Sequence, residues 1–123
     1  MQFITDRKRA EGRGSAHSGT AHHLYMQVSA VGLALIVPTF LYIFGSALGG
    51  GHEEVLATFA RPVPAIVAAL VLVVGLQHFR KGMQVVFEDY TWHSTRKVGI
   101  MVTTVLSYGL TATGLFALVK MAL

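Results

Sequence analysis

The stretch LYMQVSAVGLALIVPTFLYIFGSAL, at Leu24–Leu48, is 25 residues long and contains no charged side chain. Two more charge-free runs follow, one of 18 residues at Pro62–Phe79 and one of 22 residues at Val98–Val119. A helix needs roughly 20 apolar residues to cross the hydrocarbon core of a bilayer. A soluble chain of 123 residues has too little interior to bury three such runs. The sequence therefore predicts an all-α membrane protein with three transmembrane helices.

Hydrophobic residues make up 53% of the chain and charged residues 13%, and the basic residues are clustered. Four precede the first run and four lie between the second and third, whereas the other connection holds only Arg61 and the C-terminus only Lys120. Because cytoplasmic segments carry the excess of Lys and Arg, the N-terminus is expected in the cytoplasm, or in the mitochondrial matrix. The aromatic-interleaved basic face of a nucleic-acid binder is missing. The chain has no cysteine, which excludes disulfides and iron–sulfur ligation by its own residues.

The chain divides into a cytoplasmic N-terminal arm at residues 1–21 and a three-helix membrane anchor at residues 22–123. The spans are expected at about 22–48, 62–88 and 96–121. Hydropathy alone would end the second span at Phe79, because Arg80 and Lys81 follow. The next residues, GMQVVF, continue a helix-compatible pattern, so one helix is predicted to run to about Glu88.

His78 and Asp89 are eleven residues apart, which is close to three helical turns. They therefore share one face of the predicted helix, roughly 16 Å apart along its axis. An ionisable residue at membrane depth is energetically costly and usually faces a bundle interior. Three roles fit His78: a hydrogen bond to a neighbouring helix, ligation of haem iron, or proton relay. No other histidine is clearly at this depth, so a second axial ligand would have to come from another chain.

The residues that follow this histidine each have two interpretations. Arg80 and Lys81 either extend toward the lipid headgroups or pair with anionic haem propionates. Tyr90 is either an ordinary interfacial tyrosine or a hydrogen-bond donor to a quinone carbonyl. In the second case, Asp89 would supply or orient protons for the reduced quinone.

The segment HFRKGMQVVFEDY, at His78–Tyr90, resembles the second-helix signature of the hydrophobic membrane anchor of succinate dehydrogenase. In that family a histidine precedes an Asp-Tyr pair at the spacing seen here. TDRKRA at Thr5–Ala10 and GSA at Gly14–Ala16 are similar to the N-terminal arm of α-proteobacterial members. Three spans with the N-terminus inside extend the resemblance over nearly the whole chain.

The resemblance implies a pairing with a second membrane anchor, the cytochrome b anchor of the same enzyme, so that the two chains hold one haem b. It implies that His78 is a haem axial ligand, that Tyr90 hydrogen-bonds ubiquinone, and that Asp89 is its acidic neighbour. An iron–sulfur protein and a flavoprotein would dock on the cytoplasmic face as further partners. The complex would transfer electrons from succinate to ubiquinone in the tricarboxylic acid cycle and respiratory chain, and the isolated chain would have no catalytic residues or activity of its own.

The first span departs from the family pattern. Where some members place an arginine near the haem propionates, this chain has Gln27, with His22 and His23 one to two turns earlier. Gln27 and Ser29 are otherwise typical of polar contacts between membrane helices. The candidates for contact with the propionates are Lys81, Arg80, Gln27 and His23.

Two other classes of protein remain open from the sequence. One is a haem- and quinone-binding anchor of another respiratory complex, such as a fumarate reductase, although the His–Asp–Tyr spacing argues against it. The other is a cofactor-free membrane scaffold. In each case membrane lipids are partners, and the expected location is the bacterial inner membrane, with the mitochondrial inner membrane as the alternative.

Overall fold

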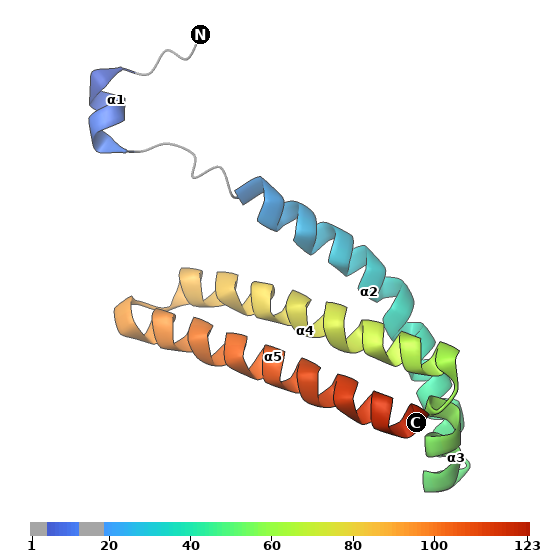
Figure 1. Ribbon diagram of the computed structural model, residues 1–123. Helices are drawn as coiled ribbons and strands as arrows, with labels where there is room; N and C mark the ends of the chain where they lie inside the picture. The colour runs from blue at the N-terminus through green and yellow to red at the C-terminus, as the bar shows by residue number, and fades with distance from the viewer. Residues whose placement is uncertain (1–4, 13–18) are drawn as a thin grey trace.

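The computed structural model describes residues 5–12 and 19–123, in which the regular secondary structure is α-helix throughout (Figure 1). The helices are α1 at Asp6–Glu11, α2 at Gly19–Leu48, α3 at Gly51–Phe59, α4 at Pro62–Tyr90 and α5 at His93–Ala122. Of these, α2, α4 and α5 are long and apolar enough to cross a membrane. The prediction of an all-helical chain with three spans is therefore confirmed.

The apolar side chains of the three long helices face outward. In the most apolar 18-residue window of α2, α4 and α5, only 6%, 6% and 11% of the residues are buried within the chain. Soluble monomers rarely expose apolar surface on this scale. The helices therefore present their apolar surface to lipid or to another apolar chain.

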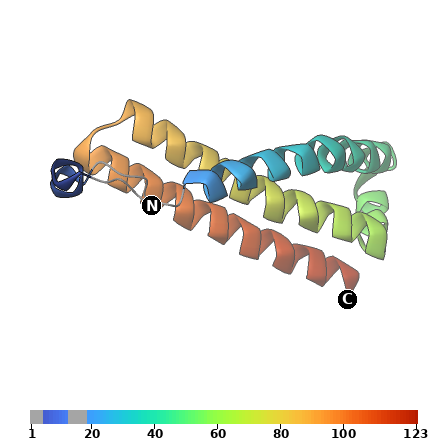
Figure 2. The same cartoon turned by 90° about the horizontal axis from the view of Figure 1, so that it is seen from above.

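Helix α4 lies between the other two long helices, packing against α2 on one side and α5 on the other (Figures 1 and 2). The short helix α3 contacts all three at the end of the bundle where α2 ends and α4 begins. At the other end, the N-terminal turns of α2 diverge from α4 (Figure 1). The bundle is thus closed at one end by α3 and open at the other.

The connection between α2 and α3 is a glycine turn. Helix α2 ends at Leu48, and Gly51 begins α3 with a φ of 82°. That left-handed conformation is accessible to glycine without a steric penalty. The connection between the first two predicted spans thus contains a helix of nine residues, α3.

Helix α4 does not end with the hydrophobic run. It continues past Phe79 through two basic residues and ends at Tyr90, two residues beyond the predicted end. Thr91 terminates it by donating its hydroxyl to the Phe87 carbonyl at 2.6 Å. Because the helix is unbroken, His78 and Asp89 lie on one face of it, as their spacing predicted.

Small residues bring α5 close to α4. Thr103 and Ser107 are 8% and 1% exposed, and the Phe87 ring lies directly against Gly99. Membrane helices use small residues in this way to let their backbones approach. The α4–α5 pair is thereby a closely packed support for the residues of α4 that face α2.

The helix starts differ slightly from the sequence prediction. Helix α2 begins at Gly19 rather than near residue 22, and α5 begins at His93 rather than near residue 96. In the N-terminal arm, α1 carries an exposed ion pair between Arg7 and Glu11 at 2.9 Å. The Gly14–Ala16 segment, used in the family resemblance, lies outside the described residues.

Candidate functional site

The side chain of His78 points from α4 toward α2, where its Nδ1 lies 2.7 Å from the hydroxyl oxygen of Ser29. That hydroxyl is also 2.7 Å from the Tyr25 carbonyl and 3.2 Å from the Met26 carbonyl of its own helix. A hydroxyl has one proton to donate, and a carbonyl can only accept. We therefore assign the Ser29 proton to the Tyr25 carbonyl, which makes His78 Nδ1–H the donor to the Ser29 oxygen. This tautomer leaves the lone pair on Nε2 free to act as a ligand.

Helix α2 is held against α4 on both sides of this hydrogen bond. Leu33 lies over Gly75 and Met26 lies over Gly82, each 3.7 Å from where a Cβ would be. These glycines are three residues before and four residues after His78, so they share its face of the helix. With Ser29 itself only 6% exposed, the histidine ring is oriented by packing as well as by its hydrogen bond.

A polar cavity of about 600 Å³ opens one turn beyond this histidine, where α2 diverges from α4. Its polar lining consists of His22, Tyr25, Lys81, Gln84 and Glu88. The Lys81 ammonium lies 5.1 Å from the centre of the Tyr25 ring, within the range of a cation–π interaction. Within the described chain, His22 Nε2 is buried and has no hydrogen-bond partner. The wall of the cavity thus combines the Lys81 ammonium with the Glu88 carboxylate and the rings of His22 and Tyr25.

Arg80 and Lys81 point to different helices. The Arg80 guanidinium lies 5.4 Å from the centre of the Tyr108 ring on α5, and its Nε donates to Gln77 Oε1 at 3.0 Å. Adjacent residues of a helix are rotated by about 100°, which separates the two cations. Only Lys81 therefore lies on the α2 side of α4, near His78.

The candidates from the first span are not gathered at this cavity. Gln27 and His23 are both exposed and neither lines it, whereas His22 does. Sequence reasoning placed His23 among the candidates because hydropathy does not define the rotation of α2. It interpreted Ser29 as a polar contact between membrane helices, and the structure places the Ser29 hydroxyl 2.7 Å from His78 of α4. This is the hydrogen bond to a neighbouring helix that was one of the three roles open to His78.

Asp89 and Tyr90 are the last two residues of α4, and both are exposed. Tyr90 is 79% exposed, and Trp92 in the following turn is 76% exposed. By helical rise, Asp89 lies roughly 16 Å along the axis from His78. The structure therefore keeps the His78 site and the Asp89–Tyr90 pair on one helix but well apart.

The described residues contain no group of three or more His, Asp or Glu side chains that could hold a bare metal ion. Haem iron has different requirements, because the porphyrin supplies four ligands and protein supplies only the axial ones. A single oriented histidine such as His78 is sufficient for that purpose. The donor set is therefore suited to haem rather than to a protein-only metal site.

Comparison with known proteins agrees with these features. The family model described as succinate dehydrogenase/fumarate reductase transmembrane subunit matches residues 1–117. The succinate dehydrogenase hydrophobic membrane anchor subunit of Paracoccus denitrificans is 43% identical over 123 residues, covering 100% of this chain and 95% of that protein. The corresponding subunit of Rickettsia bellii is 32% identical over 88 residues, covering 72% of this chain and 70% of that protein.

The corresponding subunit of Rickettsia conorii is 29% identical over 105 residues, covering 81% of each protein. No solved structure matches the chain. The family resemblance drawn from the His78–Tyr90 segment is thus confirmed by matches that extend over nearly the whole sequence. The chain belongs to the succinate dehydrogenase/fumarate reductase transmembrane subunit family, in which it is similar over its full length to a succinate dehydrogenase hydrophobic membrane anchor subunit.

Proposed function

We propose that this chain, together with a second membrane anchor, binds one haem b and forms part of the ubiquinone-reducing site of succinate dehydrogenase. The observation that carries the proposal is the 2.7 Å contact between His78 Nδ1 and the Ser29 hydroxyl oxygen, because it orients the ring and fits the tautomer with a free Nε2. Ligating histidines commonly donate their other ring N–H to a nearby acceptor in this way. Family membership indicates the enzyme to which such a haem ligand would belong.

His78 is the residue that would hold the haem iron. When bound, the haem would supply a centre that accepts and releases one electron. The other histidines of the described anchor lie near helix ends, and His22 is seven residues before Ser29, roughly 10 Å along α2. A second axial ligand would therefore come from the partner, the cytochrome b anchor.

Lys81 is the residue best suited to the haem propionates. It lines the polar cavity one turn from His78 and carries the positive charge that a carboxylate requires in a low dielectric. The same propionate would form a hydrogen bond with Nε2 of His22, which has no partner within the described residues. Arg80 is engaged with α5 instead, which makes it the weaker candidate of the two cations.

Tyr90 and Asp89 would serve ubiquinone at the end of α4. Reduction of a quinone to a quinol adds two electrons and two protons. The Tyr90 phenol can donate a hydrogen bond to a quinone carbonyl, and the Asp89 carboxyl can deliver or orient a proton. The exposure of both residues supports access for a ligand or a partner protein at this position.

Electrons would reach the quinone from other subunits. This chain has no cysteine to ligate iron–sulfur clusters, so those clusters would belong to partners. The flavin would belong to the partner flavoprotein. The basic residues of the N-terminal arm favour a cytoplasmic position for that arm. Those in the helical segments on either side of the α4–α5 turn, at Arg80, Lys81, Arg96 and Lys97, favour the same side for the turn. The iron–sulfur protein and the flavoprotein would then dock on the side of the membrane where Tyr90 lies.

The proposal is tested by the reduced-minus-oxidised absorption spectrum of the purified complex. A His78→Ala variant should lose the b-type band, whereas a variant of an exposed histidine in α3, His52→Ala, should keep it. Bound flavin, measured in the same preparations, reports assembly of the complex. A full b-type band per flavin in the His78→Ala complex would rule out this histidine as the ligand.

A further inference from the structure

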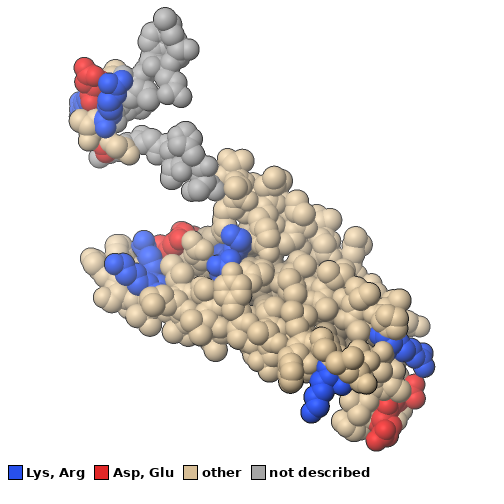
Figure 3. Space-filling view, in the orientation of Figure 1, with Lys and Arg blue, Asp and Glu red and all other residues tan. Residues whose placement is uncertain are grey.

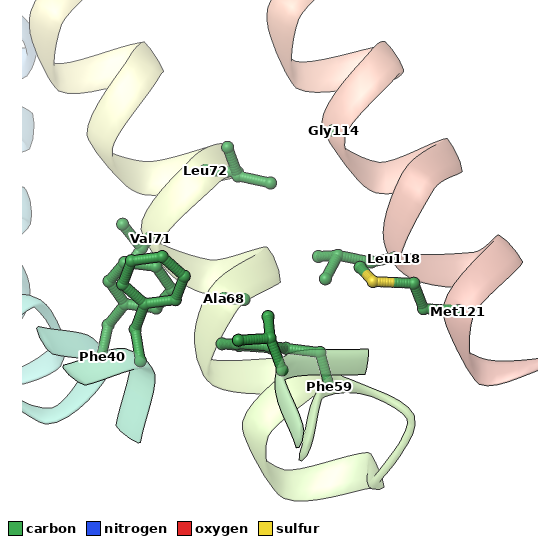
Figure 4. A pocket seen from close by; sticks show the side chains of 10 residues that line it. Phe40, Phe59, Ala68, Val71, Leu72, Gly114, Leu118 and Met121 are labelled. Atoms are coloured by element: carbon green, nitrogen blue, oxygen red, sulfur yellow. The ribbon is translucent and has the colours of Figure 1, made fainter. Parts of the chain in front are cut away.

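A second cavity, of about 350 Å³, lies at the end of the bundle closed by α3 (Figure 4). All four helices of the anchor contribute to its wall, which is made of apolar side chains and a glycine. Phe40, Phe59, Leu118 and Met121 surround it, and Ala68 of α4 lies among them (Figure 4). Its size is within the range of roughly 300–1,000 Å³ typical of ligand sites. The cavity is distinct from the polar one near Lys81, with which it shares no residue.

One side of the cavity wall is made of aromatic rings that pack against each other. The rings of Phe40, Phe44 and Phe59 form a cluster with centroid separations of 5.7, 6.1 and 6.2 Å. Phe59 and Ala68 are each only 5% exposed, so this side of the wall is buried within the bundle. An apolar cavity disfavours water but accepts hydrocarbon. In a membrane the hydrocarbon at hand is the acyl chain of a lipid.

Two cationic residues lie close in sequence to residues that line this cavity. Arg61 follows Phe59 by two residues, and Lys120 lies between Leu118 and Met121 in α5. Both are exposed, and neither forms an ion pair within residues 5–12 and 19–123. Figure 3 shows Lys and Arg side chains at this end of the molecule, separated by a wide uncharged surface from those at the other end.

Acidic residues also lie at this end, but within the described residues they form no ion pair with the two cations (Figure 3). Glu53 and Glu54 lie in the first turn of α3, where the helix dipole favours a negative charge. Arg61 lies beyond the other end of α3, directly before α4. The Arg61 and Lys120 side chains, which form no ion pair within the described residues, are therefore available to an anion outside the chain.

We infer that this cavity binds an anionic phospholipid, with one acyl chain among the phenylalanines and the phosphate held by Arg61 and Lys120. The apolar cavity matches the acyl chain of such a lipid. The two cations, which form no ion pair within the described residues, match its phosphate. Basic residues at a membrane surface attract anionic headgroups by this same charge complementarity. The lipid site is independent of the proposed haem site, because it involves other residues at the opposite end of α4.

The test uses the whole complex reconstituted in nanodiscs of equal parts phosphatidylglycerol and phosphatidylcholine. After transfer to detergent, native mass spectrometry counts the phospholipids retained per complex. Ala68→Phe fills the cavity and should abolish retention of the tightly bound phosphatidylglycerol. The matched control, Ala112→Phe, adds the same ring at an exposed position of α5 and should leave retention unchanged. Bound flavin confirms that both variants assemble.

The headgroup is tested by removing the charges. Arg61→Gln and Lys120→Gln should each weaken phosphatidylglycerol retention about fivefold, whereas Lys97→Gln at the other end of α5 should not. Equal retention of phosphatidylcholine and phosphatidylglycerol by the unmodified complex would overturn the inference. So would loss of a bound quinone, rather than a phospholipid, from the Ala68→Phe complex. Unchanged lipid retention in that complex would also overturn it.

Discussion

His78 Nδ1 lies 2.7 Å from the Ser29 hydroxyl oxygen across the α2–α4 interface, and in the tautomer assigned above it donates to that oxygen. The serine donates its own proton to the Tyr25 carbonyl, so the three groups form a chain with a fixed direction. The direction matters because it determines which histidine nitrogen is left as a ligand. Ser29, which from the sequence is typical of a polar contact between helices, therefore influences which nitrogen of His78 can act as a ligand.

Ser29→Ala removes the acceptor for His78 Nδ1–H. We expect roughly tenfold weaker haem retention, because loss of a partner that orients a ligand typically lowers metal affinity about 10- to 100-fold. The rate of haem loss from the purified complex in detergent measures the effect. Ser46→Ala is a matched control, since Ser46 makes the same 2.7 Å bond to a carbonyl of α2 but has no histidine partner. Equal haem loss from both variants would show that the Ser29 bond does not support the ligand.

Lys81→Gln should lower the midpoint potential of the haem. A nearby positive charge favours the reduced state, which carries one more electron, so its removal favours the oxidised state. A shift of roughly 60 mV would correspond to a tenfold change in a one-electron equilibrium. Redox titration followed by absorbance measures it, with Arg80→Gln as the control because Arg80 faces Tyr108 on α5. A larger shift for Arg80→Gln would reverse the assignment of the propionate contact.

Tyr90→Phe should lower succinate–quinone turnover about fivefold to tenfold, which corresponds to the loss of one hydrogen bond of about 1 kcal/mol. Succinate oxidation with an artificial electron acceptor should stay unchanged, because that reaction bypasses the quinone. Tyr42→Phe, at a 77% exposed position of α2, is the control. If Tyr90→Phe impairs both reactions equally, the tyrosine acts in assembly rather than in quinone binding.

Gly99→Ala should destabilise the α4–α5 pair by about 1–3 kcal/mol, as expected for overpacking. The added Cβ would lie 2.7 Å from Phe87 Cε1, so the ring would have to move. Gly109→Ala is the control on the same helix, because its Cβ would meet no atom within 4 Å. Thermal inactivation of the assembled complex measures both, and a lower stability for Gly109→Ala would contradict this packing of α4 on α5.

The fold follows from the sequence because its main determinant is local. Charge-free runs long enough to cross a bilayer define α2, α4 and α5 without knowledge of any tertiary contact. The continuation of α4 beyond Phe79 needed a second local observation, the helix-compatible pattern of GMQVVF at Gly82–Phe87. The short helix α3 was less evident, because nine residues beside a glycine turn give only a weak periodic pattern.

The site was only partly predictable, because its contacts depend on the rotation of long helices. A helix that is apolar on every side has no amphipathic stripe to indicate which face is inward. Consequently the sequence did not distinguish His22 from His23. Nor could it pair His78 with Ser29, which is 49 residues away and reached only through the register of two helices. The quinone role of Tyr90 remains a prediction from the family resemblance.

Ligation of haem iron by His78 Nε2 is tested most directly by the electron paramagnetic resonance spectrum of the ferric haem in the assembled complex. Substitution His78→Met replaces an imidazole nitrogen with a thioether sulfur at the iron. We predict that the low-spin signal of the wild-type complex is lost or changes its g-values, with flavin content preserved. An unchanged ferric spectrum in the His78→Met complex, at the same haem content per flavin, would contradict this ligation.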